Sequence, residues 1–464
     1  MNKFHSILSR REFMKAMGLS AAGASAVAIS SPIFQDLDEL AASDYANQGS
    51  RHPWWVKDRD FYTAAFEIDW SVFDQYDSTN NPTPQPSPTA NFAQREANLR
   101  KTGIENNIAG FSLRDQALAD MVTGLQTAAP WDGPAFTPAS AGYTAWQGNP
   151  EDNVKMIRAA LRLASADQVG AMVIDDKCLK IFDKNAVEFA NIENGERVGN
   201  VYRIPQQCKY LLTYNVLQNY VQATYTLRED PDFPGKYGFP FYTGRPAVHR
   251  AYGDGRYAEW QAMRFIKNLG YKVYKAGVTA NVALGIFSGL GEQGRATYMM
   301  TPRNGLMTRI TNYIITDMPL APTKPINFGG SVFCKNCMRC AEMCPSESLS
   351  DKKEPDWLGN GPGNRPGYIG WACEWQTCID MGAPSRCGVC HSLCPFNHPN
   401  DGLIHPIIRT VVANTSMFNS FFGAMDRNMQ YAKAKTEKDL LGWWNRDLYN
   451  WKADTTAGTG KYHW

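Results

Sequence analysis

Cysteine spacing is the feature that most constrains what this chain can fold into. Eight of its 11 cysteines lie in two short segments, CKNCMRCAEMCP and CIDMGAPSRCGVCHSLCP. The first has the spacing C-x2-C-x2-C-x3-C-P, carried by Cys334, Cys337, Cys340 and Cys344. The second ends in C-x2-C-x3-C-P after a longer first gap, with Cys378, Cys387, Cys390 and Cys394. This spacing lets three thiolates converge on one iron–sulfur cube while the fourth binds another. The motifs therefore predict two [4Fe-4S] clusters.

Crossed ligation, as in two-cluster ferredoxins, predicts which cysteines share a cluster. One cluster is expected on Cys334, Cys337, Cys340 and Cys394, and the other on Cys387, Cys390, Cys344 and Cys378. Cys373 competes with Cys378 for the outlying position. Structural zinc is disfavoured, because it does not need two four-cysteine runs that each end in Cys-Pro. Cys178 and Cys208 stand alone and are expected to be small buried apolar residues.

The N-terminal stretch SRREFMK indicates export of a folded protein. It carries the adjacent arginines Arg10 and Arg11, and a mildly apolar segment, residues 16–31, follows it. Twin arginines in this setting mark a Tat signal. The apolar segment is too short and too rich in Gly, Ala and Ser to span a bilayer well. Because iron–sulfur clusters are assembled in the cytoplasm, a protein that holds two of them has to be exported folded. The signal and the cysteine motifs therefore explain each other.

Composition excludes one class of partner and suggests several domains. The formal net charge is +2, and no basic stretch interleaved with aromatic residues stands out, so nucleic acid is not an expected partner. The 464 residues suffice for two or three domains.

Apolar periodicity predicts alternating helices and strands in the middle of the chain. A helix is expected from Pro150, with a strand at residues 170–174, a second strand at 210–217 and an amphipathic helix at 257–270 closed by Gly270. This alternation favours an α/β domain. Residues 93–125 are expected to be helical after a surface loop at 79–92, and the chain beyond about residue 400 is expected to be helical and rich in aromatic residues.

Several longer stretches together resemble the catalytic subunit of the corrinoid-dependent respiratory reductive dehalogenases. They are SRREFMK, PWWVKDRDF, EIDWS, ALRLASADQVGAMVID, FIKNLGY, SGLGEQGRATYMMTPRNGLMTRI, TDMPLAPTKPINFG and the two cysteine motifs, which together cover nearly the whole chain. The resemblance implies an α+β or α/β fold with a nitroreductase-like corrinoid-binding core and a C-terminal ferredoxin-like dicluster domain. The expected divisions are a Tat signal (1–42), an N-terminal covering region (43–149), the corrinoid-binding core (150–325), the dicluster domain (326–400) and a helical extension (401–464).

The resemblance also implies an activity and its cofactors. Halide would be removed reductively from a chlorinated ethene or chlorinated aromatic compound by a Co(I) corrinoid, with electrons supplied through the two clusters, in anaerobic organohalide respiration. The corrinoid, a cobalamin, is expected base-off without a protein histidine ligand. The absence of a D-x-H-x-x-G motif among the seven histidines is consistent with this.

Site residues follow from the same resemblance. Tyr252, in RAYGDGR, matches the proton donor without a gap, the alternative being an ordinary tyrosine at a helix start. Arg309, in NGLMTRI, matches a cation that stabilises the phenolate. The loop 289–305 is expected to wrap the corrinoid, with Gly291, Gly294 and Thr301 allowing close approach. A third polar position stays open among Lys275, Asn281, Ala276 and Val278.

The expected partners are a small organohalide substrate, a small membrane-anchor subunit, an upstream respiratory electron donor and the Tat translocase. The protein is expected to lie peripherally on the outer face of the cytoplasmic membrane. Two alternatives remain. An epoxyqueuosine reductase-like corrinoid enzyme predicts a basic face for tRNA and no Tat signal, and a dicluster electron-transfer protein predicts no corrinoid.

Overall fold

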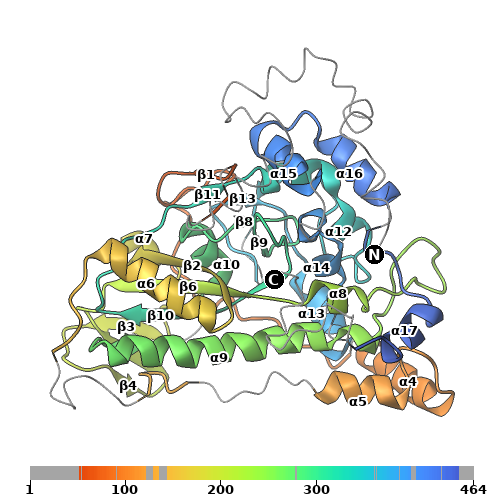
Figure 1. Cartoon of the computed structure of the whole chain (residues 1–464), viewed down its shortest axis with the longest axis horizontal. Coiled ribbons are helices and arrows are strands. Elements are labelled where there is room, and N and C mark those ends of the chain that lie inside the picture. The colour runs from red at the N-terminus through yellow and green to blue at the C-terminus, as the bar shows by residue number, and fades with distance from the viewer. Residues whose placement is uncertain are drawn as a thin grey trace.

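The structure is a computed structural model that describes residues 52–53, 55–89, 91–121, 129–134, 144–276, 279–359, 361, 363–385, 387–398, 404–429 and 431–448. The predicted export signal, with Arg10 and Arg11, lies outside these residues, and so does Val278. Figure 1 shows a central sheet with one long helix, α9, running along it and smaller helices gathered toward one side.

The central sheet has four strands, and every neighbouring pair is antiparallel. Its order is β2-β6-β10-β7, made of β2 (Ala166–Val173), β6 (Tyr210–Leu217), β10 (Thr308–Thr316) and β7 (Val273–Tyr274). Strand β6 is central and buried on both faces, which agrees with its nearly continuous apolar sequence. An antiparallel sheet corrects the α/β interpretation of the helix–strand alternation, because that pattern is typical of a parallel sheet. The arrangement is α+β.

Two helices cover one face of this sheet. They are α6 (Pro150–Leu163) and α9 (Pro246–Asn268), and their apolar residues share a core with Leu212 and Tyr214 of β6. Helix α6 begins where predicted, because Asn149 caps it by accepting a hydrogen bond from the Asp152 amide (2.8 Å). Helix α9 ends near Gly270, whose φ of 97° closes it as predicted.

Helix α9 begins 11 residues before the predicted start, at Pro246. Proline suits the first position of a helix, since its amide would have no partner there. Tyr252 therefore lies inside the helix rather than at its start, and its role as proton donor stays a prediction.

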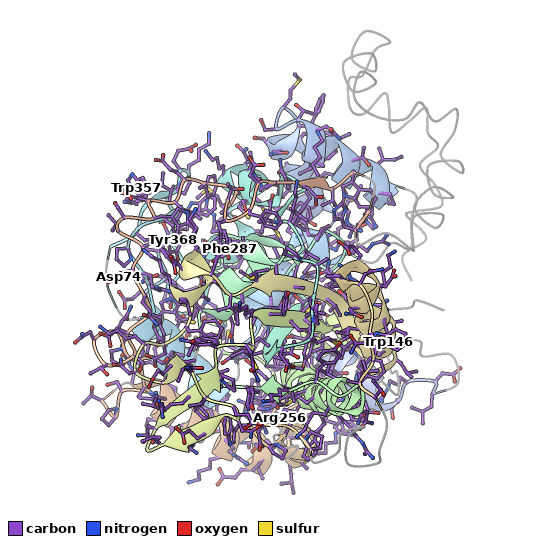
Figure 2. All side chains as sticks on the ribbon, turned by 90° about the vertical axis from the view of Figure 1, so that its left-hand side faces the viewer. Asp74, Trp146, Arg256, Phe287, Trp357 and Tyr368 are labelled. Carbon is purple, nitrogen blue, oxygen red and sulfur yellow. The ribbon has the colours of Figure 1, made fainter. Side chains whose placement is uncertain are left out.

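The second face of the sheet is covered by α10 (Asn281–Phe287) and by the N-terminal region. Phe287, labelled in Figure 2, contacts the rings of Tyr62 (5.7 Å) and Trp70 (5.6 Å). At the edge of the molecule in the same view, Trp146 donates to Asn153 Oδ1 (3.0 Å) and fastens the segment before α6. The predicted lone cysteines, Cys178 and Cys208, are fully buried in this second core, which confirms their expected apolar role.

Smaller elements surround the sheet. A second sheet of order β3-β5-β4 contains β3 (Val187–Ala190), β5 (Val201–Pro205) and β4 (Glu196–Val198). The remaining helices of this part are α4 (Asn91–Glu105), α5 (Leu113–Met121), α7 (Asp176–Leu179), α8 (Tyr220–Thr224) and the 3-10 turn η4 (Tyr242–Gly244). Short ladders pair β1 (Lys57–Asp58) with β11 (Ile326–Asn327), and β8 (Glu292–Gln293) with β9 (Met299–Met300). None of the helices that the structure describes is long and apolar enough to cross a membrane.

The cysteine segments form a helical region that packs against the β8–β9 hairpin. It contains α11 (Gly330–Cys337), α12 (Arg339–Glu342), β12 (Asp356–Trp357), β13 (Ile369–Gly370), α13 (Trp375–Ser385), α14 (Val389–Leu393) and η5 (Pro395–Asn397). Three later helices follow, α15 (Ile404–Asn414), α16 (Asn419–Asn428) and α17 (Glu437–Trp444). Figure 1 shows α15 and α16 above the cysteine segments and α17 beside α4 and α5. One apolar core joins Met300, Phe333, Phe396 and Phe422 across these segments.

Candidate functional site

Four of the predicted ligands line one small cavity, and we call them the Cys334 group: Cys334, Cys337, Cys340 and Cys394. Met338 takes a left-handed conformation (φ 54°) between α11 and α12, so the chain reverses there and Cys340 turns back toward the first two cysteines. The rest of the wall is mainly apolar and includes Met300, Leu306 and Phe333. The cavity joins residues from both cysteine segments, as crossed ligation requires.

The other four predicted ligands lie together in a second place, and we call them the Cys387 group: Cys344, Cys378, Cys387 and Cys390. Burial raises the pKa of the Cys390 thiol well above its usual range, and the three neighbouring thiols raise it further. Buried thiols of this kind are favoured as thiolates only when a metal centre compensates their charge.

Cys373 lies beside Cys378, so the structure brings both candidates for the outlying ligand to the same place. A hydrogen bond between the two side chains raises the pKa of Cys373 and lowers the pKa of Cys378. The two thiols thus share one proton, and Cys378 as the outlying ligand stays a prediction.

Each cysteine group supplies the four thiols that one iron–sulfur cube requires. Within the part of the chain that the structure describes, no three His, Cys, Asp or Glu side chains are close enough to share one metal ion. Thiolates that bind different corners of a cube stand farther apart than thiolates around one zinc ion. Two groups of four cysteines in mainly apolar surroundings can thus hold two cubes and pass single electrons.

Tyr252 and Arg309 come from different elements and meet on the α9 side of the sheet. Tyr252 is 47% exposed on α9, and the guanidinium carbon of Arg309 in β10 lies 5.8 Å from the centre of its ring. This distance is within the range of a cation–π contact. The pair predicted from the sequence is therefore close enough for the arginine charge to act on the phenol.

His391 holds Arg309 in place, and sequence reasoning missed it. Arg309 Nη1 lies 3.0 Å from His391 Nδ1 and 3.4 Å from Nε2, and Nδ1 also lies 2.9 Å from the Leu306 carbonyl. In the tautomer in which Nδ1 donates to that carbonyl, Nε2 is the acceptor for Arg309. Burial, reinforced by the Arg309 charge, lowers the pKa of His391 to about 3, so the ring is neutral at neutral pH. Its position directly after Cys390 is the signal that was available in the sequence.

Aromatic rings connect this pair to the Cys387 group. The Tyr298 ring lies 4.4 Å from the His391 ring and 6.0 Å from the Trp375 ring. Burial raises the pKa of Tyr298 well above its usual range, and the thiols of Cys390 and Cys378 raise it further. One continuous wall of side chains therefore runs from Tyr252 to the Cys387 group.

The three residues expected to approach the corrinoid have internal structural roles. A side chain at Gly291 would meet the Met300 carbonyl within the β8–β9 hairpin, and Gly294 lines the cavity of the Cys334 group. Thr301 is fully buried, with its backbone paired to Gly305. Contact of these residues with a corrinoid stays a prediction.

The candidates for the third polar position are engaged with other groups. Lys275 forms an ion pair with the fully buried Glu259, and Asn281 accepts a hydrogen bond from the Thr279 hydroxyl (2.5 Å). Ala276 is buried. The third position stays unassigned.

Several buried polar atoms, some of them beside Arg309, have no hydrogen-bond partner among the described residues. They are Arg309 Nε, both side-chain polar atoms of Gln218, and Trp375 Nε1. Gln218 follows Leu217, the register partner of Thr308, and its amide donates to the Met307 carbonyl (2.9 Å), so it lies at the same end of the sheet as Arg309. Buried polar groups are rarely left unpaired, so these atoms mark a place for a polar ligand.

Two curated relatives that align with nearly the whole chain are named reductive dehalogenases. A chloroethene reductive dehalogenase of Dehalococcoides mccartyi (strain VS) is 30% identical, with 96% of this chain and 98% of that protein aligned. A trichloroethene reductive dehalogenase of the same species (strain ATCC BAA-2266 / KCTC 15142 / 195) is 27% identical over 95% of this chain and 97% of its own length. No model of a protein family matches the chain.

Solved structures agree at the level of the fold. The catabolic reductive dehalogenase NpRdhA superposes with a TM-score of 0.56 at 18% identity, covering 87% of this chain. This chain spans 53% of the length of that protein. The similarity to relatives over nearly their whole length is decisive: the chain belongs to the reductive dehalogenases, oxidoreductases that act on carbon–halogen bonds.

Proposed function

We propose that this enzyme removes halide from a chlorinated ethene, using a base-off corrinoid and two [4Fe-4S] clusters, in anaerobic organohalide respiration. The observation that carries the proposal is the wall of side chains that joins Tyr252 and Arg309 to the Cys387 group. The names of the two full-length relatives, which refer to chloroethene and trichloroethene, favour a chlorinated ethene over a chlorinated aromatic substrate.

The residues present fit both kinds of cofactor. The two cysteine groups supply eight thiols in two sets, and the rest of the lining of the Cys334-group cavity is mainly apolar. The unpartnered atoms of Gln218, Arg309 and Trp375 suit a large ligand with amide groups at its edge, such as a corrinoid. When bound, the corrinoid supplies a strongly reducing cobalt centre and the clusters supply single electrons.

Tyr252 has the chemistry of the proton donor. Breaking a carbon–halogen bond reductively leaves a carbon that needs a proton, and a phenol keeps its proton at neutral pH. Its ring is half-exposed, while Arg309 beside it stabilises the phenolate that forms when the proton leaves. His391 stays neutral, so it accepts from Arg309 without adding charge.

Replacing Arg309 with Gln is expected to lower kcat about 10²–10³-fold, as for other lost electrostatic partners of a developing anion. Arg309→Lys should recover only part of this loss, because a lysine lacks the fork that reaches both Tyr252 and His391. Steady-state halide release at saturating substrate measures the effect. Unchanged kcat in Arg309→Gln, with iron and cobalt retained, would exclude the electrostatic role.

In this proposal the Tat route exports the enzyme to the outer face of the cytoplasmic membrane, where a small membrane-anchor subunit binds it. A reporter fusion with Arg10→Lys and Arg11→Lys should stay in the cytoplasm, although the net charge of the signal is unchanged. Fractionation of cells that express this fusion and the parent fusion measures the difference. Equal export of both would contradict the Tat interpretation.

Metal analysis tests the cofactor set. Protein purified without oxygen should contain cobalt in an equimolar amount and about eight iron atoms per chain, from two cubes of about four each. Full iron with no cobalt under conditions of corrinoid supply would instead support a dicluster electron-transfer protein.

A further inference from the structure

Arg295 is a buried cation held entirely by backbone carbonyls. It lies in the turn between β8 and β9 and is 1% exposed. Its Nε and Nη2 donate to the Cys334 carbonyl (3.2 and 3.0 Å), and Nη2 also donates to the Lys353 carbonyl (3.3 Å). Its Nη1 donates to the carbonyls of Ser350 (2.8 Å) and Lys352 (2.7 Å). All the donors of the guanidinium are satisfied by these bonds.

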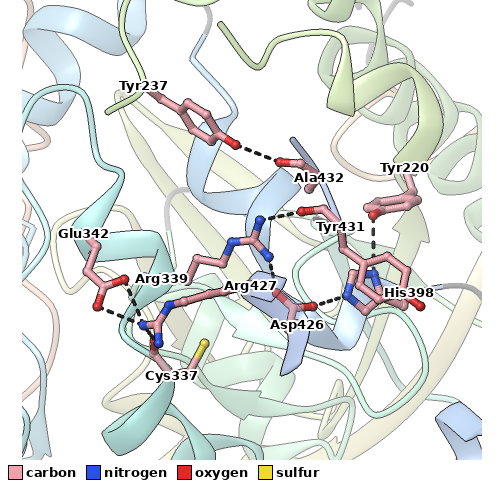
Figure 3. Close-up of polar contacts among 10 residues, drawn as sticks. All are labelled: Tyr220, Tyr237, Cys337, Arg339, Glu342, His398, Asp426, Arg427, Tyr431 and Ala432. Atoms are coloured by element: carbon pink, nitrogen blue, oxygen red, sulfur yellow. Dashed lines mark hydrogen bonds and ion pairs between the residues drawn. The ribbon is translucent and has the colours of Figure 1, made fainter. Parts of the chain in front are cut away.

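No carboxylate pairs with Arg295 among the residues that the structure describes. Two other arginines near the Cys334 group do have such partners, as Figure 3 shows. Arg339 binds Asp426, and Arg427 binds Glu342 through both oxygens (2.9 Å each). The nearby Glu292 is already bound by Arg59 (3.1 Å). Arg295 therefore carries a buried positive charge that no carboxylate contacts among the described residues, with Glu342 acting on it only at longer range.

A buried charge without a counter-charge is costly even when its hydrogen bonds are satisfied. Arg295 lines the same cavity as the four cysteines of the Cys334 group, and its guanidinium stacks on Trp371, 4.5 Å from the ring centre. Four thiolates around a cube give that cavity a net negative charge, which increases when the cube accepts an electron. The thiolates of the Cys334 group, which line the same cavity, can therefore supply the counter-charge that Arg295 lacks.

We propose that Arg295 is the built-in counter-charge of the cluster in the Cys334 group and raises its reduction potential. The inference rests on the proposed clusters and adds a role for a residue outside the ligand set. The sign follows from charge: a fixed cation stabilises the reduced, more negative cluster more than the oxidised one. The bonds to the Cys334 carbonyl hold the cation at a set position beside the first ligand.

Redox titration followed by electron paramagnetic resonance tests the proposal. Arg295→Gln should lower the reduction equilibrium constant of this cluster about tenfold, a shift of about 59 mV for one electron, with the other cluster unchanged. Arg427→Gln is the matched control. Arg427 also donates to a ligand carbonyl, that of Cys337 (2.5 Å), but its charge is neutralised by Glu342 and both side chains are about 40% exposed. The cluster potential in Arg427→Gln should shift much less than in Arg295→Gln, because solvent screens the exposed Arg427 charge, although this charge also acts on Cys337.

Arg295→Lys separates charge from hydrogen bonding, because it keeps the cation and loses the fork. A potential near the parent value supports the charge effect, and a potential as low as that of Arg295→Gln overturns it. An unshifted potential in iron-loaded Arg295→Gln also overturns it. If Arg295→Gln and Arg295→Lys both lose iron, the Cys387→Ser protein isolates the paramagnetic signal of the cluster in the Cys334 group. A reduction potential of this cluster at or below that of the other cluster, measured in the parent protein, overturns the proposal. Parent protein without iron would contradict the clusters themselves, which is a different failure.

Discussion

Tyr252→Phe is expected to slow halide release about 10²–10⁴-fold, the usual cost of losing a well-placed general acid. The substitution keeps the ring that packs near Arg309 and removes only the hydroxyl that carries the proton. Iron and cobalt contents should therefore match those of the parent. Initial rates of chloride release from a chlorinated ethene, with reduced methyl viologen as electron donor, measure the effect.

Tyr257→Phe is the matched control for this prediction. Tyr257 lies on the same helix, α9, and is 45% exposed, almost the same as Tyr252, but it is five residues away and therefore points to another side of the helix. Its loss should leave the rate unchanged. If Tyr252→Phe released chloride as fast as Tyr257→Phe and the parent, another group would have to be the acid.

Cysteine substitutions are expected to remove one cluster at a time. Cys334→Ser and Cys387→Ser should each lower the iron content from about eight to about four atoms per chain, because each protein loses one cube. The two variants should lose different electron paramagnetic resonance signals. Full iron in both proteins would contradict the proposed ligand sets.

Cys373 and Cys378 give this experiment a sharper form. The two side chains are hydrogen-bonded to each other, so either thiol is close enough to the Cys387 group to be its outlying ligand. Cys378→Ala should lose the cube of the Cys387 group, and Cys373→Ala should keep it. The reverse pattern would make Cys373 the outlying ligand.

Local sequence patterns predicted individual elements better than their assembly. Strand β6 spans residues 210–217, as predicted, because its apolar run is bounded clearly. The start of α9 was missed because Gly253 and Gly255 weaken the helical pattern around Tyr252. At Gly255 the helix lies close to the sheet, because the Tyr214 hydroxyl donates to its carbonyl (3.3 Å), whereas a side chain at Gly253 would meet no neighbouring atom. The antiparallel order depends on long-range pairing, which no local pattern contains.

The site divides in a similar way. Cysteine spacing indicated both groups of thiols, because the ligands lie close together in the sequence. Tyr252 and Arg309 were identified only through a family resemblance, since a single tyrosine or arginine carries no pattern of its own. His391 and Arg295 were missed because their roles depend on contacts with Arg309 and with the Cys334 carbonyl, which only the folded chain reveals.

The most direct test of the account is halide release by the protein loaded with corrinoid and iron. Anaerobic assays with reduced methyl viologen should cover a panel of chlorinated ethenes and chlorinated aromatic compounds, with metal-free protein as the control. The proposed function predicts release of chloride from at least one chlorinated ethene, formation of the product with hydrogen in place of chlorine, and no reaction without cobalt. Fully loaded protein that releases no halide from any compound in the panel would contradict it.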